Sequence, residues 1–520
     1  MEKQDATPHE DSLKKRYVSR VLSNTISFVI GIATIGIVPR SLGPVLYGNY
    51  QFLKSFFEYF QSFFDLGTST CFQVKYSARP EEKLLSAFFF KYVLLAVAAM
   101  FLTVAGVFLL SFGGKMWPGQ EMNFVFLALG MAVLSFLSLN MLVMVDAHGL
   151  TVKAEIYRIV LGIVVTAVLL LMYHYRVITL RNYFLFQYFN FGALFAGLWG
   201  LLRRTGKAVG VTRLLPRSEL KKYAKEFFTF VHPLVTYQLI ASGALLAQRW
   251  MLQLFGGSAQ QGFYGLSYSV SAVCAMFSGS MTSLITREFS VAWQVRNLEK
   301  MAALFRRYVP LLFSITAYFS CFVCVQADLI VAVVGGERYQ GALLPIRIMA
   351  LFPLLQTYGQ LGGSVLLATE RTKLHRNIGA AGLLASLAAA WFLLAPTRLL
   401  GLGAGAAGLA ICTVGLSFIT VNAQLYYNAK FLRMPFYWYF LHQVLSTLLF
   451  ILLAAAARQL TSFCLGHSSG NIIISFLLSG VLYTLIAAAL FHLFPGIFGL
   501  NRDDVRDFIA RLRNYLPHRK

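Results

Sequence analysis

Five polar side chains share one face of a helix that is otherwise apolar, aromatic-rich and long enough to cross a bilayer. They are Gln51, Lys54, Glu58, Gln61 and Asp65, at successive spacings of three, four, three and four residues. This spacing places all five on the same side of an α-helix. Inserting a charged side chain at membrane depth costs about 3 kcal/mol, so such a face is expected to line a bundle interior or a watery cavity. This polar stripe therefore predicts a polar path through the membrane.

A simpler interpretation of the polar stripe is an ion pair along the helix between Lys54 and Glu58. Lys54 would then extend toward one membrane surface and Asp65 toward the other. This interpretation gives no reason for Gln51 and Gln61 to share the face, and both interpretations remain open.

The chain that must position this stripe is an all-α polytopic membrane protein. Of its 520 residues, 58% are hydrophobic and 13% are charged, and its mean hydropathy is +0.65. A soluble multidomain protein is not this apolar. Apolar runs of about 20 residues, bounded by charges, glycine or proline, predict about 14 transmembrane helices.

The net charge of +24 would suggest nucleic acid as a partner in a soluble chain. Here the Lys and Arg residues concentrate in every second loop, for example Lys14–Arg20, Arg203–Lys225 and Arg502–Lys520. By the positive-inside rule these loops are cytoplasmic, and so are both termini. The charge is therefore a topology signal, and no nucleic acid is expected to bind.

Nothing in the sequence indicates an enzyme. The six cysteines lie mostly in apolar segments, and Cys321 with Cys324 lacks the second Cys or His pair of a zinc site. No loop is large enough to carry the acid, base or metal ligands of a membrane glycan polymerase or ligase. We therefore expect no catalytic residues, no metal and no cofactor.

An internal repeat divides the chain into two halves. Gly43, Gly48 and Tyr50 match Gly257, Gly262 and Tyr264 at the same internal spacing, each set between two expected spans. Six-helix halves repeated in the same orientation permit rocking-type alternating access. The expected parts are an N-terminal lobe (1–202), a basic cytoplasmic linker (203–228), a C-terminal lobe (229–430), two accessory spans (431–494) and a cytoplasmic tail helix (495–520).

Several of these stretches resemble one transporter family. LGPVLYGNYQF, FFDLGTSTCFQVKYSA, QRWMLQLFGGSAQQGFYGLSYSV and GALLPIRIMALFPLLQTYGQLGGSVLLATERTK are similar in kind and order to the Wzx-like polysaccharide and O-antigen flippases of the MATE-like MOP superfamily. The resemblance implies two pseudo-symmetric six-helix lobes around a central cavity, with two extra C-terminal helices here. It also implies a flippase that moves undecaprenyl-diphosphate-linked oligosaccharide to the outer leaflet of the bacterial cytoplasmic (inner) membrane.

The implied partners are this cargo and the membrane lipids, with a coupling ion (H+ or Na+) and the polysaccharide polymerase machinery as further candidates. Gln248 departs from the family, since many relatives carry an acid there, and this puts acid-dependent coupling at that position in doubt.

Such a cargo carries a diphosphate, which requires cations in the cavity. Lys54 and Arg249 are the candidate cations, at similar depth from the outer ends of their spans. Alternatively, the Arg249 side chain extends to the membrane surface or pairs with Glu58. Arg20 and Asn24, at the inner end of the first span, either receive the diphosphate first or anchor the helix. A cation-coupled drug exporter of the same superfamily is the alternative function, and would favour acids over these cations.

Overall fold

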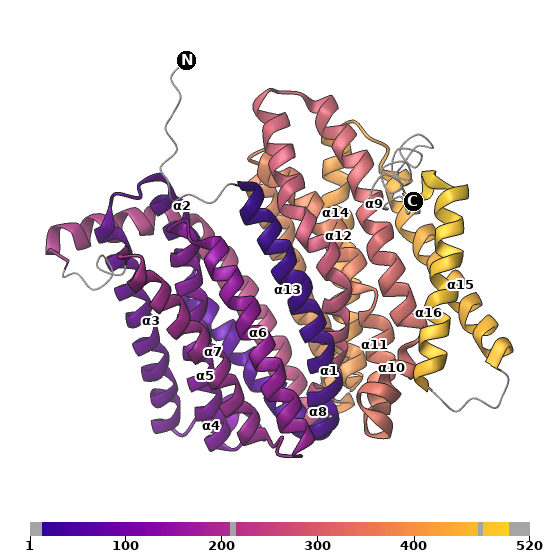
Figure 1. The fold of residues 1–520 in the computed structure, drawn as a ribbon, viewed down its shortest axis with the longest axis horizontal. Coiled ribbons are helices and arrows are strands. Elements are labelled where there is room, and N and C mark those ends of the chain that lie inside the picture. The colour runs from indigo at the N-terminus through magenta and orange to yellow at the C-terminus, as the bar shows by residue number, and fades with distance from the viewer. Residues whose placement is uncertain (1–12, 208–214, 466–471, 499–520) are drawn as a thin grey trace, which may run out of the picture. The chain divides into compact units, whose positions relative to one another are not determined.

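The chain is folded into long helices, seen in a computed structural model that describes residues 13–207, 215–465 and 472–498 (Figure 1). Contacts between Cα atoms divide it into two compact units. The N-terminal unit is Met1–Gly262 together with Leu394–Gly403, and the C-terminal unit is Phe263–Leu393 together with Ala404–Lys520. The boundary between these units falls inside the helix Arg217–Gln294, and the lobes and linker predicted from the sequence stay a prediction.

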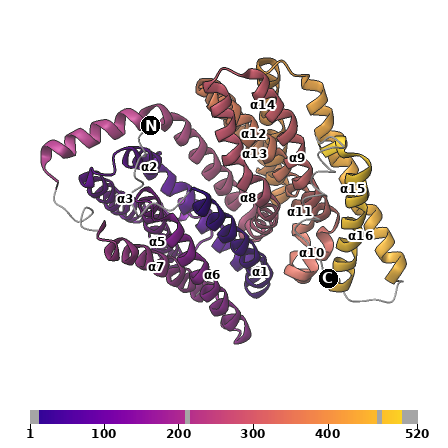
Figure 2. The ribbon, with the colours of Figure 1, turned by 45° about the horizontal axis from the view of Figure 1, so that its top comes forward.

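The N-terminal unit is a bundle in which α5 packs against α7 and α1 packs against α6 (Figures 1 and 2). Its helices are α1 (Leu13–Asp65), α2 (Thr68–Ala78), α3 (Lys83–Leu109), α4 (Gly113–Met116), α5 (Met122–Ala147), α6 (Thr151–His174), α7 (Leu180–Arg204) and the first part of α8 (Arg217–Gln294). Aromatic stacking closes its core, for example between Phe72 and Phe89, whose ring centroids are 4.4 Å apart. On α3, Leu95 and Leu102 face outward, 68% and 73% exposed, as expected of a helix surrounded by lipid.

The two longest helices each break at a glycine. The backbone of α1 leaves helical geometry at Gly43 (φ 72°), and that of α8 does so at Gly257 (φ 75°). Positive φ is accessible to glycine without steric cost, and Pro44, directly after Gly43, cannot donate to the preceding turn. Each break lies where the sequence predicts the boundary between two spans.

The C-terminal unit is built around a core shared by α9, α12, α14, α15 and α16. Its elements are the rest of α8, then α9 (Leu298–Val325), α10 (Ala327–Val334), η2 (Gly336–Ala342), α11 (Leu343–Met349), α12 (Phe352–Ala368), α13 (Thr372–Leu394), α14 (Gly405–Phe431), α15 (Phe436–Leu465), α16 (Ile472–Leu493) and η4 (Pro495–Phe498). α12 packs against α14, and α15 packs against both α9 and α16. Most of the predicted tail helix (495–520) lies outside the described residues.

The accessory helices α15 and α16 are fastened to the unit by polar contacts. Arg458 of α15 donates to the carboxylate of Asp328 in α10, with an Nη1–Oδ1 distance of 2.6 Å, and to the Val325 carbonyl at 2.8 Å. Tyr483 of α16 donates to the Tyr318 carbonyl of α9 at 3.0 Å. A charge-assisted, two-pronged arginine contact is among the stronger polar contacts in proteins, so these helices are an integral part of the unit.

By length and composition, eleven helices of the described chain could cross a membrane. The number is twelve if the two parts of α8, Arg217–His232 and Val235–Met276, form one span across the 65° bend between them. α1 counts once, from Ile30 to Asp65, although it breaks at Gly43. The all-helical, multi-pass fold is confirmed. The number of about 14 stays a prediction, in which α1 and α8 contribute two spans each.

The amphipathic stretch before the bend of α8 is helical, and its apolar side packs on protein. The Tyr223 and Phe227 rings lie 5.8 and 5.0 Å from that of Phe88 in α3. Glu226 on the same segment pairs with Lys75 of α2 at 3.1 Å. The second part of the predicted basic linker (203–228) is therefore helical, and its apolar side packs against the N-terminal unit.

The membrane orientation can be tested by cysteine labelling. In a variant without the six native cysteines, Lys222→Cys should react with a membrane-impermeant maleimide only after the cells are opened, because its loop is predicted to be cytoplasmic. The matched control is Leu400→Cys, in the loop before α14, which is 87% exposed and predicted to be external. Labelling of Lys222→Cys in intact cells would reverse the orientation.

Candidate functional site

The N-terminal half of the polar stripe contains a partly exposed ion pair. Lys54 Nζ lies 3.7 Å from Glu58 Oε1, with side chains 38% and 54% exposed. One turn earlier, Gln51 Nε2 donates to the hydroxyl of Tyr47 at 2.6 Å. The opposite face of this segment is buried, with Phe52, Phe56 and Phe57 in the core and the Trp117 ring against Phe56. This packing of the aromatic face holds the polar residues on the other side.

The C-terminal half of the stripe, Gln61 and Asp65, is engaged in structural contacts. Gln61 is buried and its Nε2 donates to the Ala132 carbonyl of α5 at 2.7 Å. Asp65 accepts from the backbone N–H of Gly67 and of Ser69, both at 3.2 Å, and from the Ser69 hydroxyl at 3.0 Å. Such contacts cap the start of a helix, here α2. The structure brings Gln51, Lys54 and Glu58 together, and a cavity role for Gln61 and Asp65 remains a prediction.

Arg249 is buried inside the N-terminal unit, only 6% exposed. Its Nη1 donates to Oε1 of Gln261 at 3.4 Å, and Gln261 Nε2 donates back to the Arg249 carbonyl at 2.5 Å. This exchange spans the break of α8 at Gly257. The guanidinium is therefore held inside the protein, and its depth in the membrane stays a prediction.

Lys54 and Arg249 belong to one electrostatic environment. The ammonium of Lys54 interacts with the carboxylate of Glu58 and with the like charge of Arg249, and all three groups lie in the N-terminal unit. The sequence predicts the two cations on different halves. The structure places Arg249 in the N-terminal unit because α8 stays with that unit through Gly262.

Aromatic hydroxyls complete this cluster, and sequence reasoning did not identify them. The Tyr50 and Tyr183 rings meet edge to face, 4.7 Å apart, and Tyr183 of α7 also interacts with the Lys54 ammonium. A signal was present for Tyr47, which lies four residues before Gln51 and seven before Lys54 on the same helix face. No comparable local pattern marks Tyr183, since its partners lie far away in the chain.

The two glycine-broken turns of the internal repeat interlock. A Cβ atom on Gly48 would lie 1.7 Å from the carbonyl oxygen of Ser258, and one on Gly262 would lie 2.2 Å from that of Pro44. Both contacts are within the N-terminal unit. Matching glycines in the repeat thus allow each turn to seat against the backbone of the other, and we call this contact the glycine lock.

Amide side chains surround the glycine lock. Gln120 Nε2 donates to Asn49 Oδ1 at 2.9 Å, and Gln253 Nε2 donates to the Ser258 hydroxyl and the Pro118 carbonyl, both at 3.0 Å. The Gln120–Asn49 and Gln253–Pro118 bonds join segments far apart in sequence, so they hold the α1 turn, the α4–α5 loop and the α8 turn together.

No protein-family model matches the sequence, and no curated protein matches it. Its fold is nevertheless found in solved structures. An outward-facing multidrug resistance MATE transporter of the MOP superfamily is 13% identical, with a TM-score of 0.55 over 81% of this chain and 95% of that one. A MOP-superfamily transporter from Pyrococcus furiosus is 12% identical, with a TM-score of 0.53 over 81% and 96%. The lipid II flippase MurJ, in an inward-closed conformation, is 10% identical, with a TM-score of 0.64 over 92% and 98%.

The chain has the fold of the MOP-superfamily transporters. At 10–13% identity these similarities establish the fold, and the cargo must be inferred from this chain's own residues. This fold is the one that the sequence motifs indicate, while membership of the superfamily and of its Wzx-like branch remains a prediction.

Within the MOP fold, Arg20 and Asn24 lie in α1, but their side chains are outside the described part of the structure. Among the residues that are described, no three His, Cys, Asp or Glu side chains lie close enough to hold a metal ion. The chemistry available at the cluster of Lys54, Glu58 and Arg249 is reversible ion pairing and hydrogen bonding.

Proposed function

We propose that this chain is a flippase for a lipid-linked oligosaccharide, which it moves from the cytoplasmic to the outer leaflet without chemical change. The observation that carries the proposal is the pair of cations, Lys54 and Arg249, which lie in one unit and in helices predicted to span the membrane. A charged residue inside a membrane span is costly and by default indicates a functional site. Two cations suit an anionic headgroup, and the diphosphate of an undecaprenyl-linked glycan is such a group.

The Lys54–Glu58 pair is suited to exchange its partner for a phosphate. A partly exposed pair at this spacing stabilises the helix by only about 0.3–0.5 kcal/mol. A phosphate oxygen offers the ammonium a charge-assisted hydrogen bond that is stronger than a neutral one. Glu58 would thus neutralise Lys54 when no cargo is bound and release it when cargo enters.

The wider architecture of the proposal follows the MOP fold. The cavity between the two lobes (1–202 and 229–430) would open alternately to the two sides of the inner membrane. The accessory spans (431–494) would bring the total to about 14 spans. MurJ, described as a lipid II flippase, matches over more of this chain than the MATE transporters do, 92% against 81%. This difference favours a lipid-linked cargo, and a coupling ion remains part of the proposal.

The test uses proteoliposomes that contain the purified protein and an undecaprenyl-diphosphate oligosaccharide with a fluorescent label. Transport is measured as the appearance of label accessible to a membrane-impermeant quencher. We expect transfer in protein-containing vesicles and none in empty ones. In cells, deletion should leave lipid-linked units on the cytoplasmic face and remove surface glycan. Lengthening or transfer of glycan chains by the pure protein would replace this proposal with an enzyme.

Export of cationic drugs is the second candidate. The observation that favours it is the Glu58 carboxylate, 54% exposed beside Lys54, since a cation needs an acid to pair with. The same vesicles loaded with a cationic dye decide between the two functions. The drug exporter would be established if the wild type released the dye and transferred no lipid-linked oligosaccharide, and if Glu58→Gln no longer released the dye.

A further inference from the structure

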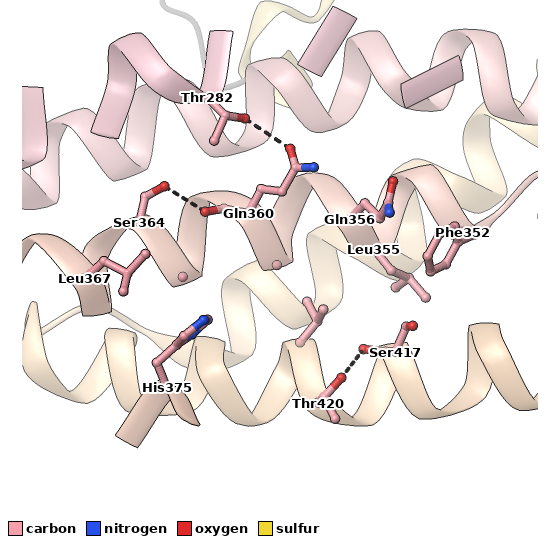
Figure 3. A pocket seen from close by; sticks show the side chains of 13 residues that line it. Thr282, Phe352, Leu355, Gln356, Gln360, Ser364, Leu367, His375, Ser417 and Thr420 are labelled. Atoms are coloured by element: carbon pink, nitrogen blue, oxygen red, sulfur yellow. Dashed lines mark hydrogen bonds between the residues drawn. The ribbon is translucent and has the colours of Figure 1, made fainter. Parts of the chain in front are cut away.

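The C-terminal unit contains a pocket that the cation cluster does not use. Its volume is about 500 Å³, and it lies between α12 and parts of α8, α13 and α14 (Figure 3). Pockets for small organic ligands have volumes of about 300–1,000 Å³, whereas a water molecule needs about 30 Å³. The pocket is therefore large enough for a small organic group and too large for a single ion.

Seven of the side chains that line this pocket are polar, none is an acid, lysine or arginine, and most of the remaining lining surface is apolar. Its polar residues are Thr282, Gln356, Gln360, Ser364, His375, Ser417 and Thr420. Gln360 and Ser364 extend from α12 toward Thr282, whose hydroxyl donates to Gln360 Oε1 at 3.1 Å, while His375, Ser417 and Thr420 lie on the other side (Figure 3). Amides, hydroxyls and an imidazole provide both donors and acceptors.

Part of this hydrogen-bonding capacity is unused within the protein. Among the described residues, neither the amide of Gln356 nor the hydroxyl of Ser417 makes a hydrogen bond to another side chain or to the backbone, and both line the pocket. Ring and aliphatic carbons of Phe352, Leu355 and Val421 provide an apolar wall beside them. A ligand with several hydroxyl groups and one apolar face matches this combination.

Two glycines keep the pocket open. A Cβ atom on Gly359 would lie 3.0 Å from Val421 Cγ2, and one on Gly363 would lie 3.1 Å from His375 Cε1. Because both glycines lie on the pocket side of α12, any larger residue there would fill the space between α12 and its neighbours. The spacing of Gln356 and Gln360, four residues apart, places their side chains on the same side of the helix.

We propose that this pocket binds a neutral sugar residue of the cargo's glycan, an inference that rests on the proposed function. An anionic ligand would require a Lys or Arg in the lining, and a cationic drug would require an acid. A prenyl tail would bury the side chains of Gln356 and Ser417 without hydrogen-bond partners, which is costly. The thirteen lining residues contain none of these charges and have seven polar side chains. Hydroxyl groups on one face and C–H groups on the other are the features of a pyranose ring.

The test compares two probes on the purified protein in lipid nanodiscs: undecaprenyl diphosphate, and the same lipid carrying a neutral trisaccharide. We expect the wild type to bind the trisaccharide probe about tenfold more tightly, a difference of about 1.4 kcal/mol. One or two net hydrogen bonds between neutral groups supply this amount. Gln356→Leu combined with Gln360→Leu should reduce the ratio to less than about twofold and leave binding of the bare diphosphate lipid unchanged.

Gln459→Leu is the matched control, since it makes the same exchange at an exposed position of α15 and should keep the tenfold ratio. Equal affinity of the wild type for both probes, or an unchanged ratio in the double variant, would overturn the pocket proposal and leave the proposed function in place. A wild type that binds neither probe would overturn the proposed function itself.

Discussion

Lys54→Ala and Arg249→Ala are each expected to abolish export while leaving membrane insertion intact. Each removes one cation from the site proposed to hold the diphosphate, and a hydrogen bond to a charged group contributes about 1.5–3 kcal/mol. This corresponds to a loss of binding of at least about tenfold. Lys54→Arg should retain more activity, because the charge is kept and a diphosphate also accepts a guanidinium. The measurement is the rate of lipid transfer in the proteoliposome assay.

Lys115→Ala provides the control for the loss of a positive charge. Lys115 is an exposed cation of the same unit, in α4, and lies 5.7 Å from the centre of the Phe112 ring. Its replacement should leave transfer within about twofold, since an exposed contact of this kind contributes less than about 1 kcal/mol. Normal transfer by an Ala variant of Lys54 or Arg249 would remove that residue from the site. Monodisperse elution of each variant in detergent shows that a lost activity is not lost folding.

Gly48→Ala should disrupt the glycine lock and stop transport. The new methyl group would lie 1.7 Å from the Ser258 carbonyl oxygen and 2.8 Å from the Gly262 nitrogen, so the α1 turn must move away from the α8 turn. Overpacking of this kind costs about 1–3 kcal/mol. We expect a lower thermal unfolding temperature and a transfer rate reduced at least tenfold. Gly262→Ala should behave in the same way.

Gly36→Ala is the matched control, because Gly36 lies in α1 and a Cβ atom there would have nothing within 4 Å. Alanine is favoured over glycine inside a helix by about 0.5–1 kcal/mol, so this variant should be unchanged or slightly more stable. A Gly48→Ala variant with the stability and transfer rate of Gly36→Ala would show that the two turns do not depend on close contact.

The polar stripe shows what helix periodicity can predict and what it cannot. The spacing of Lys54 and Glu58 correctly indicates neighbouring side chains on one helix face. The contact of Gln61 with the Ala132 carbonyl joins residues 71 positions apart, and no local pattern carries that information. Asp65 is different, since Asp-Leu-Gly-Thr-Ser is a common beginning for a capped helix, and this signal could have been recognised.

The division into halves shows a similar limit. The repeated glycines correctly locate the breaks in α1 and α8, because a positive φ is a local requirement of the backbone. The assignment of Arg249 to the N-terminal unit depends on how α8 packs after its bend, which composition does not encode. The pocket in the C-terminal unit had a visible signal in the paired spacing of Gln356 with Gln360 and of Gly359 with Gly363. The pocket itself forms only where α8, α13 and α14 surround α12, which this spacing does not predict.

The glycine lock can form only late in the synthesis of this protein. Gly48 enters the membrane early, and the backbone against which it seats is synthesised about 210 residues later, at Ser258. At typical rates of about 5–20 residues per second, the first turn waits roughly 10–40 s for its partner. During that interval the α1 turn lacks its final backbone contact, and Lys54 already carries its charge while Arg249 has not yet been made. Glu58, only four residues away, arrives in time to pair with Lys54, so the first hairpin enters the bilayer with its own counterion.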